Sequence, residues 1–187
     1  MKINKVVMAV AFTAALASGA AIAAGDTAGQ IKFEGELVTT ACGLSANSSP
    51  VNVNFYQVPI TKLANGNEAT VQKNIELQYC DTATASTAEV TYTPTSTSTS
   101  NPELAAFTPG STAKGAGIGL YDSNNKVVTW GTKTSAVTLK DGTTNIPFIA
   151  FLRAESTKDA SDPTKVTYST PTAGTFSSTI NFVIAYK

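Results

Sequence analysis

The sequence predicts an all-β sandwich, and three observations support that prediction. Short segments in which apolar and polar residues alternate recur along the chain, as they do in strands that bury one face. Turn-forming pairs such as Asn65-Gly66 and Asp141-Gly142 separate these segments. Helical periodicity is nearly absent, and residues 103–107 are expected to form a turn or two of helix at most. Many short strands punctuated by turns are typical of a sandwich.

The first element is a secretory signal peptide. Two lysines precede an apolar stretch over residues 6–16, and small residues follow up to Ala23. This order of charged, apolar and small residues is the signature of such peptides, and the apolar run is too short for a comfortable membrane span. We expect residues 1–23 to be removed. Cleavage after Ala24 is the alternative, and a retained anchor helix is the less favoured interpretation.

The segments expected to form strands follow in order along the remaining chain. Residues 31–37 open the series with alternating apolar and polar residues. Residues 146–152 are almost continuously apolar, as in a strand buried on both faces. Residues 82–100 are rich in Ser and Thr, so we expect a strand over 86–93 and then a mobile surface loop. The other expected strands are residues 51–55, 71–80, 117–121, 126–130 and 136–139, and residues 90–92 form the apolar part of the strand over 86–93.

The last segment, residues 175–187, carries the most information. Five apolar residues in it share one parity, and Ser178 is the only polar residue in that row. The five are Phe176, Ile180, Phe182, Ile184 and Tyr186. Residues of one parity lie on one face of a strand, so a two-faced strand is expected here. It runs to the end of the sequence with no later strand to cover it, and a long apolar edge pairs readily with another chain. The pattern therefore suggests a protein that a partner chain completes.

The two cysteines, Cys42 and Cys80, are expected to form one structural disulfide. Two cysteines in a secreted chain usually pair, because the compartments outside the inner membrane are oxidising. A redox-active pair is the alternative, but such pairs usually lie close together in sequence.

The composition argues against several classes of function. The chain has 13 Lys and Arg residues, 13 Asp and Glu residues and no His. Loss of the signal peptide removes two lysines, which leaves 11 cations against 13 anions and a net charge of −2. We therefore expect no binding of nucleic acid, for which a cationic stripe would be needed. The commonest general base and metal ligand is also missing, so we expect no enzyme, no cofactor and no metal.

A combination of features gives the chain a family resemblance. Cys42 follows an alternating segment by a few residues, Cys80 closes a second strand, Gly174 lies fourteenth from the end and Tyr186 is penultimate. Together with the signal peptide, this pattern resembles the fimbrial subunits of the chaperone–usher family, close to the major pilins of type 1 fimbriae. One departure is residues 152–154, Leu-Arg-Ala, where such pilins often carry Ala-Arg-Tyr.

The resemblance implies an immunoglobulin-like sandwich of six strands that lacks its seventh. A groove beside the last strand would be filled first by a strand of a periplasmic chaperone and then, by donor-strand exchange, by the N-terminal extension of the next subunit. Residues 24–40 would be this extension and residues 41–187 the pilin domain. The expected donor-strand residues are Ile31, Phe33, Gly35 and Leu37, with Gly35 at a shallow part of the groove. The expected acceptor groove and chaperone-binding strand comprise Gly174, Phe176, Ile180, Phe182, Ile184 and Tyr186.

The function that the resemblance implies is a structural subunit of a bacterial surface fimbria that supports adhesion. Its partners would be copies of itself or related pilins in a head-to-tail fibre, a periplasmic chaperone and an outer-membrane usher. The subunit would pass through the periplasm and end on the cell surface. The alternatives are a self-contained immunoglobulin-like adhesin or carbohydrate-binding module and, less favoured, a secreted hydrolase. In the first alternative, residues 31–37 would be an ordinary first strand of their own domain.

Overall fold

The computed structural model describes residues 29–159, 161–162 and 164–187. The expected signal peptide lies outside them. Residues 29–36 belong to a different unit from residues 37–187, and the two units are described separately. Residues 29–39 lie in neither a helix nor a strand. The strand expected at residues 31–37 is therefore absent, because a strand needs a ladder partner and this segment has none among the described residues.

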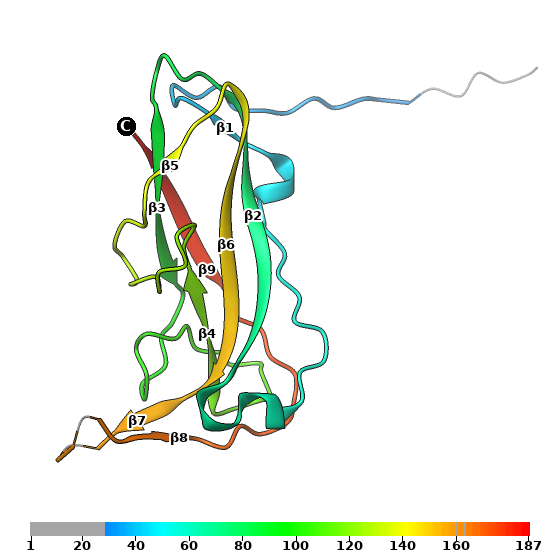
Figure 1. Ribbon diagram of the computed structural model, residues 1–187. Helices are drawn as coiled ribbons and strands as arrows, with labels where there is room; N and C mark the ends of the chain where they lie inside the picture. Colours follow the sequence, from blue (N-terminus) through cyan, green and yellow to red (C-terminus); the bar gives the residue numbers. More distant parts are fainter. Residues whose placement is uncertain (1–28, 160, 163) are drawn as a thin grey trace, which may run out of the picture. The chain divides into compact units, whose positions relative to one another are not determined.

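Residues 37–187 form an immunoglobulin-like sandwich of two antiparallel sheets (Figure 1). The first sheet has the order β1-β2-β6-β4, from β1 (Gly43–Leu44), β2 (Glu68–Cys80), β6 (Gly142–Ala154) and β4 (Ala116–Tyr121). The second has the order β5-β3-β9, from β5 (Val137–Thr138), β3 (Thr87–Pro94) and β9 (Ile180–Tyr186). Two short 3-10 helices, η1 (Ala46–Ser48) and η2 (Ile60–Gly66), and a hairpin of β7 (Ser156–Lys158) and β8 (Val166–Tyr168) complete the described elements.

The core lies between the two sheets and follows the period of two in the strands. Ile75 and Leu77 of β2 are fully buried, and so is Val90 of β3 from the opposite sheet. Ile146 and Phe148 of β6 join the same cluster. Transfer of each such side chain from water into the core stabilises the sandwich by about 1.5–3 kcal/mol. The alternation read from the sequence therefore reports which face of each strand meets the other sheet.

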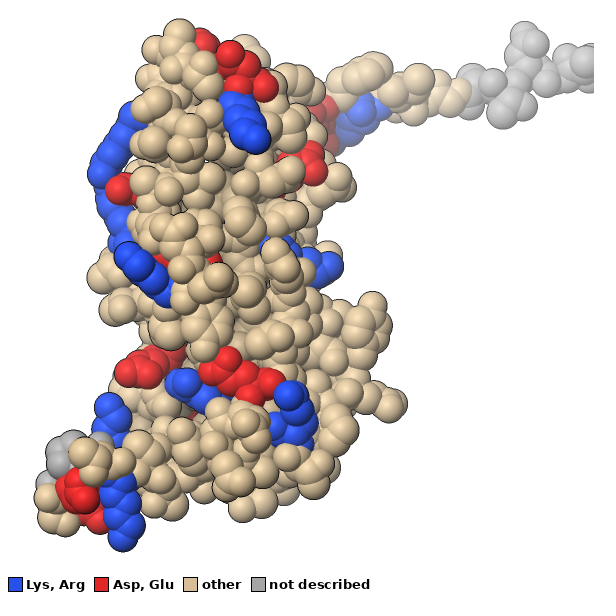
Figure 2. Space-filling model, viewed as in Figure 1, with Lys and Arg blue, Asp and Glu red and all other residues tan. Residues whose placement is uncertain are grey.

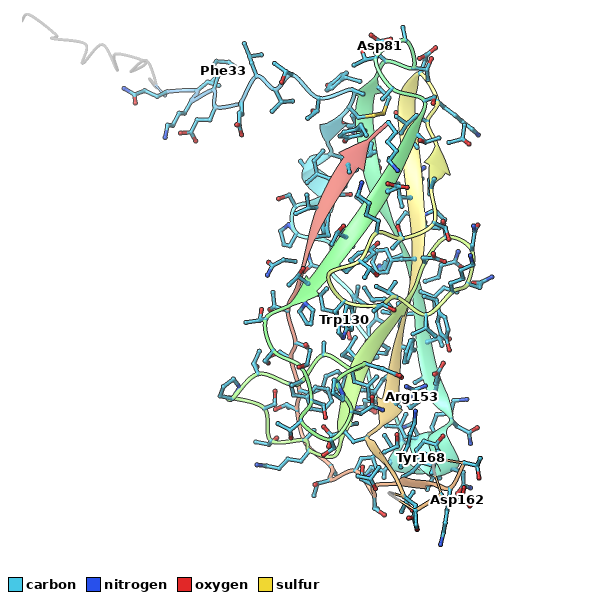
Figure 3. The ribbon with its side chains drawn as sticks, turned by 90° about the vertical axis from the view of Figure 1, so that its left-hand side faces the viewer. Phe33, Asp81, Trp130, Arg153, Asp162 and Tyr168 are labelled. Atoms are coloured by element: carbon cyan, nitrogen blue, oxygen red, sulfur yellow. A yellow bond between two sulfur atoms is a disulfide. The ribbon has the colours of Figure 1, made fainter. Side chains whose placement is uncertain are left out.

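Strand β6 is apolar on both faces for a local reason. Its residue Phe151 lies opposite Gly119 of β4 and is fully buried, although its neighbours Ala150 and Leu152 belong to the inner row. The ring lies where a side chain at Gly119 would be, so only glycine fits there. Tyr121 packs on the ring at 4.7 Å between centroids, and the guanidinium of Arg153 lies 5.2 Å from its centre (Figure 3). A small second cluster thus covers the outside of this sheet.

Several expected elements differ from those observed. Nine strand segments are described, and four of them, β1, β5, β7 and β8, are only two or three residues long. Residues 51–55 form no strand, and residues 126–130 contribute only an isolated bridge at Val127. Residues 103–107 form no helix, which agrees with the expectation of a turn or two at most, whereas the last strand begins at Ile180 and not at residue 175. No helix among the described residues has the length and apolar character needed to cross a membrane.

The Ser/Thr-rich segment contains more structure than expected for a surface loop. Ser98 is buried, and its hydroxyl oxygen accepts hydrogen bonds from the backbone N–H groups of Ser100 and Asn101. Its own N–H donates to the carbonyl of Leu104, which is fully buried. A hydroxyl that serves as a local turn acceptor can therefore be buried without an apolar pattern to reveal it.

Cys42 and Cys80 form a disulfide, as expected, across a sequence separation of 38 residues. Cys42 directly precedes β1 and Cys80 ends β2, so the bridge joins the start of the sandwich to the end of its second strand. Both residues are buried in the main core cluster. In the chain-entropy account, closing a loop of this length restricts the unfolded chain and stabilises the fold.

Replacement of both cysteines, Cys42→Ser with Cys80→Ser, is expected to lower the free energy of unfolding by about 2–4 kcal/mol. Urea denaturation of the purified protein measures the change. Reduction of the unmodified protein with dithiothreitol should give the same loss, and the double variant should not respond to the reductant. Equal stability of oxidised and reduced protein would show that the bridge contributes nothing.

Candidate functional site

Strand β9 is the edge of its sheet. It pairs with β3 along its whole length, from Ala88 opposite Tyr186 to Pro94 opposite Ile180. No strand among the described residues pairs with its other side. The inward row of β9 is only half-buried, in contrast to Ile75 and Leu77 of β2 in the opposite sheet, which are fully buried. An apolar edge left in this state is a site for strand addition.

A second unpaired edge lies across from β9. Residues 51–58 make no backbone–backbone hydrogen bond with any described residue, and Tyr56 N–H donates to the side chain of Asn54. The side chains alternate nevertheless: Val51, Val53 and Phe55 are half-buried against the core, and the residues between them are exposed. The segment thus has the side-chain pattern of a strand without a ladder.

A groove of about 640 Å³ runs between these two edges. One wall is residues 48–53 with Phe55, and the other is residues 176–182. Its floor is apolar and comes from both sheets: Ile75, Tyr92, Ile118, Leu120, Phe148 and Ala150. None of its lining residues is charged. Burial raises the pKa of Tyr92 on the floor, and the nearby carboxylate of Asp122 adds to this shift.

The groove continues into an end pocket of about 490 Å³ that shares Val53, Phe55 and Phe176 with it. The ring of Phe176 stacks on that of Phe107 at 4.8 Å and meets that of Phe55 at 6.1 Å. Buried Leu63 of η2 and Leu152 of β6 also line the pocket. Such contacts at this spacing are favourable for aromatic rings, and they give this end of the groove an apolar aromatic wall.

Gly174 sits where the wall of the end pocket is pressed against another backbone. A side-chain carbon at this position would overlap the backbone N of Ala113 and the backbone and hydroxyl of Thr112. Thr175 keeps the two segments together, since its carbonyl accepts hydrogen bonds from the N–H groups of Thr112 and Ala113. The glycine therefore permits the approach that holds Phe176 in the groove wall.

The far end of β9 is tied down near the disulfide. The hydroxyl of Tyr186 donates to the carbonyl of Cys42 at 3.4 Å, and burial raises the pKa of this tyrosine. The carbonyl of Lys187 accepts hydrogen bonds from the backbone N–H groups of Ser86 and Thr87. The ammonium groups of Lys187 and Lys133 both contact the carboxylate of Glu89, and these contacts hold the pKa of Glu89 below its ordinary value.

The structure thus brings together most of the residues expected at the groove. Gly174 and Phe176 line the end pocket, and Phe176, Ile180 and Phe182 line the main groove. Ile184 and Tyr186 continue the same row and pack on the core, but they do not line the groove. The opposite wall, residues 51–55, was not recognised from the sequence as part of the site. Its alternation was the available signal, but alternation does not reveal which edge of a strand is unpaired.

The expected donor residues lie in the N-terminal segment and its junction with the sandwich. The side chains of Ile31, Phe33 (labelled in Figure 3) and Leu37 are 81%, 86% and 103% exposed. A side chain at Gly35 would meet no atom within 4 Å. Between these residues stand Lys32, Glu34 and Glu36, so charged and apolar residues alternate by parity. The segment therefore has one face suited to an apolar groove and one suited to water.

The described residues offer little support for other site chemistry. They contain no group of three or more His, Cys, Asp or Glu side chains that could hold a metal ion. The face drawn in Figure 2 carries Lys and Arg interspersed with Asp and Glu. Such a mixed face has no single-sign field to attract a polyanion.

Comparison with known proteins gives consistent matches over nearly the whole chain. The profile of the family described as fimbrial protein matches residues 31–187. The chain is 43% identical to the major fimbrial subunit of Proteus mirabilis, with both chains covered completely. It is 33% identical to the type-1 fimbrial protein A chain of Escherichia coli, over 80% of this chain and 87% of that protein.

Two solved structures share the fold. A chain from a chaperone–usher pilus matches with a TM-score of 0.69 and 23% identity, over 87% of this chain and 98% of its own length. The P pilus rod subunit PapA matches with a TM-score of 0.62 and 23% identity, over 79% of this chain and all of PapA. At these identities the matches support the incomplete immunoglobulin-like fold and nothing finer.

Gly174→Ala is expected to lower the free energy of unfolding by about 1–3 kcal/mol, because the added methyl group forces the wall away from residues 112–113. Gly110→Ala is the matched control, since no atom lies within 4 Å of the added carbon. It should change stability by at most about 1 kcal/mol, toward stabilisation. Urea denaturation compares the two, and equal values would remove the steric role assigned to Gly174.

Proposed function

Since this chain belongs to the fimbrial protein family, we propose that its groove is filled, in an assembled fibre, by the N-terminal segment of a neighbouring copy. The protein is a structural subunit of a bacterial surface fimbria. The observation that carries the proposal is the pairing of two features in one chain. The sandwich has an apolar groove between two unpaired backbone edges, and the chain has an exposed segment whose apolar side chains alternate.

Backbone hydrogen bonding supports the insertion of a strand in preference to a helix or a small molecule. An inserted strand can bond to β9 on one side and to residues 51–55 on the other, and so satisfy donors and acceptors on both edges. The alternation of Val51, Val53 and Phe55 matches that of the inward row of β9, so both walls accept the same pleat. The inserted strand would join the second sheet, β5-β3-β9, to residues 51–55, so that the sheet and this wall would form one continuous layer.

The side chains of the N-terminal segment supply the apolar contribution. Burial of Ile31, Phe33 and Leu37 stabilises the inserted state by about 1.5–3 kcal/mol for each residue. This gain and the ladder hydrogen bonds oppose the loss of conformational freedom in the segment. Lys32, Glu34 and Glu36 would lie on the opposite face and stay in water. Gly35 would lie where the groove is shallow and a larger side chain would collide with the floor.

Insertion of one copy into the next gives a filament. The contact joins two different surfaces, the segment of one subunit and the groove of another, and such a contact need not close into a ring. The proposed role is structural and uses no catalytic residue, cofactor or metal. Before assembly, a periplasmic chaperone would cover the same groove with a strand of its own, and an outer-membrane usher would receive the subunit for export to the cell surface.

Deletion of residues 24–40 is expected to abolish self-assembly, because the variant keeps a groove but has nothing to insert. Electron microscopy of cells that express the variant should show no fibres. A synthetic peptide of residues 24–40 should bind the variant and raise its thermal unfolding temperature. Fibres formed by the deletion variant would contradict the assignment of this segment.

Gly35→Leu is expected to slow assembly about 10- to 100-fold, because a side chain that overpacks the groove costs about 1–3 kcal/mol during insertion. Light scattering follows the rate. Glu36→Leu is the matched control, since it adds the same side chain at the neighbouring position on the face that points to water. Equal slowing by both variants would indicate a general effect of leucine and would remove the steric role of Gly35.

A further inference from the structure

Tyr56 interrupts the groove wall with an unusual backbone conformation. Its φ is 54°, in the left-handed region that tyrosine seldom adopts. Its N–H donates to the side-chain oxygen of Asn54 at 2.7 Å, a short side-chain turn that holds this conformation. The ring is 86% exposed, so its burial does not account for the backbone conformation.

The conformation of Tyr56 interrupts the alternation of core-facing and exposed side chains along the groove wall. Before it, Val53 and Phe55 point to the core two residues apart, as in a strand. After it, the next side chain packed on the core is Val58, three residues beyond Phe55. A straight strand that pairs with residues 51–55 cannot keep the same pairing through Gln57 and Val58, because the pleat no longer matches.

We propose that the turn at Tyr56 is a register stop, which ends the ladder between the groove wall and the inserted segment of a neighbouring copy. The inference rests on the proposed function and adds the point at which pairing must end. The backbone of Tyr56 performs this role and its ring does not.

The end pocket lies beside this stop. Residues 53–58 all line the pocket, and among them Phe55 and Val58 also pack on the second core cluster, three residues apart, which a regular strand would not allow. Apolar side chains, among them Leu63, Phe107 and Leu152, line the pocket beside the point where pairing along the wall ends. A side chain of the inserted segment that enters it fixes the segment along the groove, so the stop and the pocket define one register together.

Amide hydrogen exchange of assembled wild-type fibres, resolved to single residues by mass spectrometric fragmentation, tests the stop. Relative to the unassembled protein, alternate amides of residues 51–55 and the outer-edge amides of β9 should exchange on the order of 100-fold more slowly, and those of Gln57 and Val58 should change by less than about threefold. Slowing that continues through Val58 would overturn the stop. Unchanged exchange on both walls would instead contradict the proposed function.

Two substitutions separate the backbone of Tyr56 from its ring. Tyr56→Asn keeps a residue that tolerates positive φ, so the boundary of slowed exchange should stay at Phe55. Tyr56→Val disfavours positive φ, so slowed exchange should extend to Gln57 and Val58 in its fibres. Loss of slowed exchange at residues 51–55 in Tyr56→Asn fibres would show that the ring is required, and it would overturn the inference. An unchanged boundary in Tyr56→Val fibres would overturn it as well.

Discussion

The unpaired backbone on the outer edge of β9 is the constraint on which the rest of the structure depends. Backbone donors and acceptors must be bonded, either to protein or to water. Within the part of the chain that the structure describes, β9 bonds to β3 on one side and to no strand on the other, while its apolar row faces the core. Water can satisfy the edge but leaves that row half-exposed, and a strand satisfies both. The segment at residues 51–58 has the same need on the facing wall.

Contacts at both ends fix the position of the β9 wall of the groove. The disulfide joins the residue before β1 to the end of β2, and the Tyr186 hydroxyl ties the end of β9 to Cys42. At the opposite end, the close approach at Gly174 fixes the position of Phe176. The β9 wall is anchored at both ends in this way, so a strand that enters the groove does not bear the cost of ordering that wall.

The sequence predicted the fold class, the disulfide and the inward row of the last strand, because each follows from a local period or from the chemistry of one residue type. The facing wall was missed as part of the site. The alternation of Val51, Val53 and Phe55 shows which side chains face the core, but it does not show which strand pairs with this segment. The start of β9 at Ile180 was also missed, since residues 175–179 bond to residues 95, 108, 112 and 113 in place of a strand. Buried Ser98 and the short β7–β8 hairpin depend on turn hydrogen bonds, which leave no periodic signal.

The direction of the groove along β9 has a mechanical consequence for a fibre of such subunits. Tension transmitted through an inserted segment would pull along its own strand, so the hydrogen bonds on both edges would be loaded together and not one after another. Forced separation is governed by the rate of crossing a barrier and not by the equilibrium free energy. A link of this shape can therefore resist flow for long periods even though each of its bonds is individually weak.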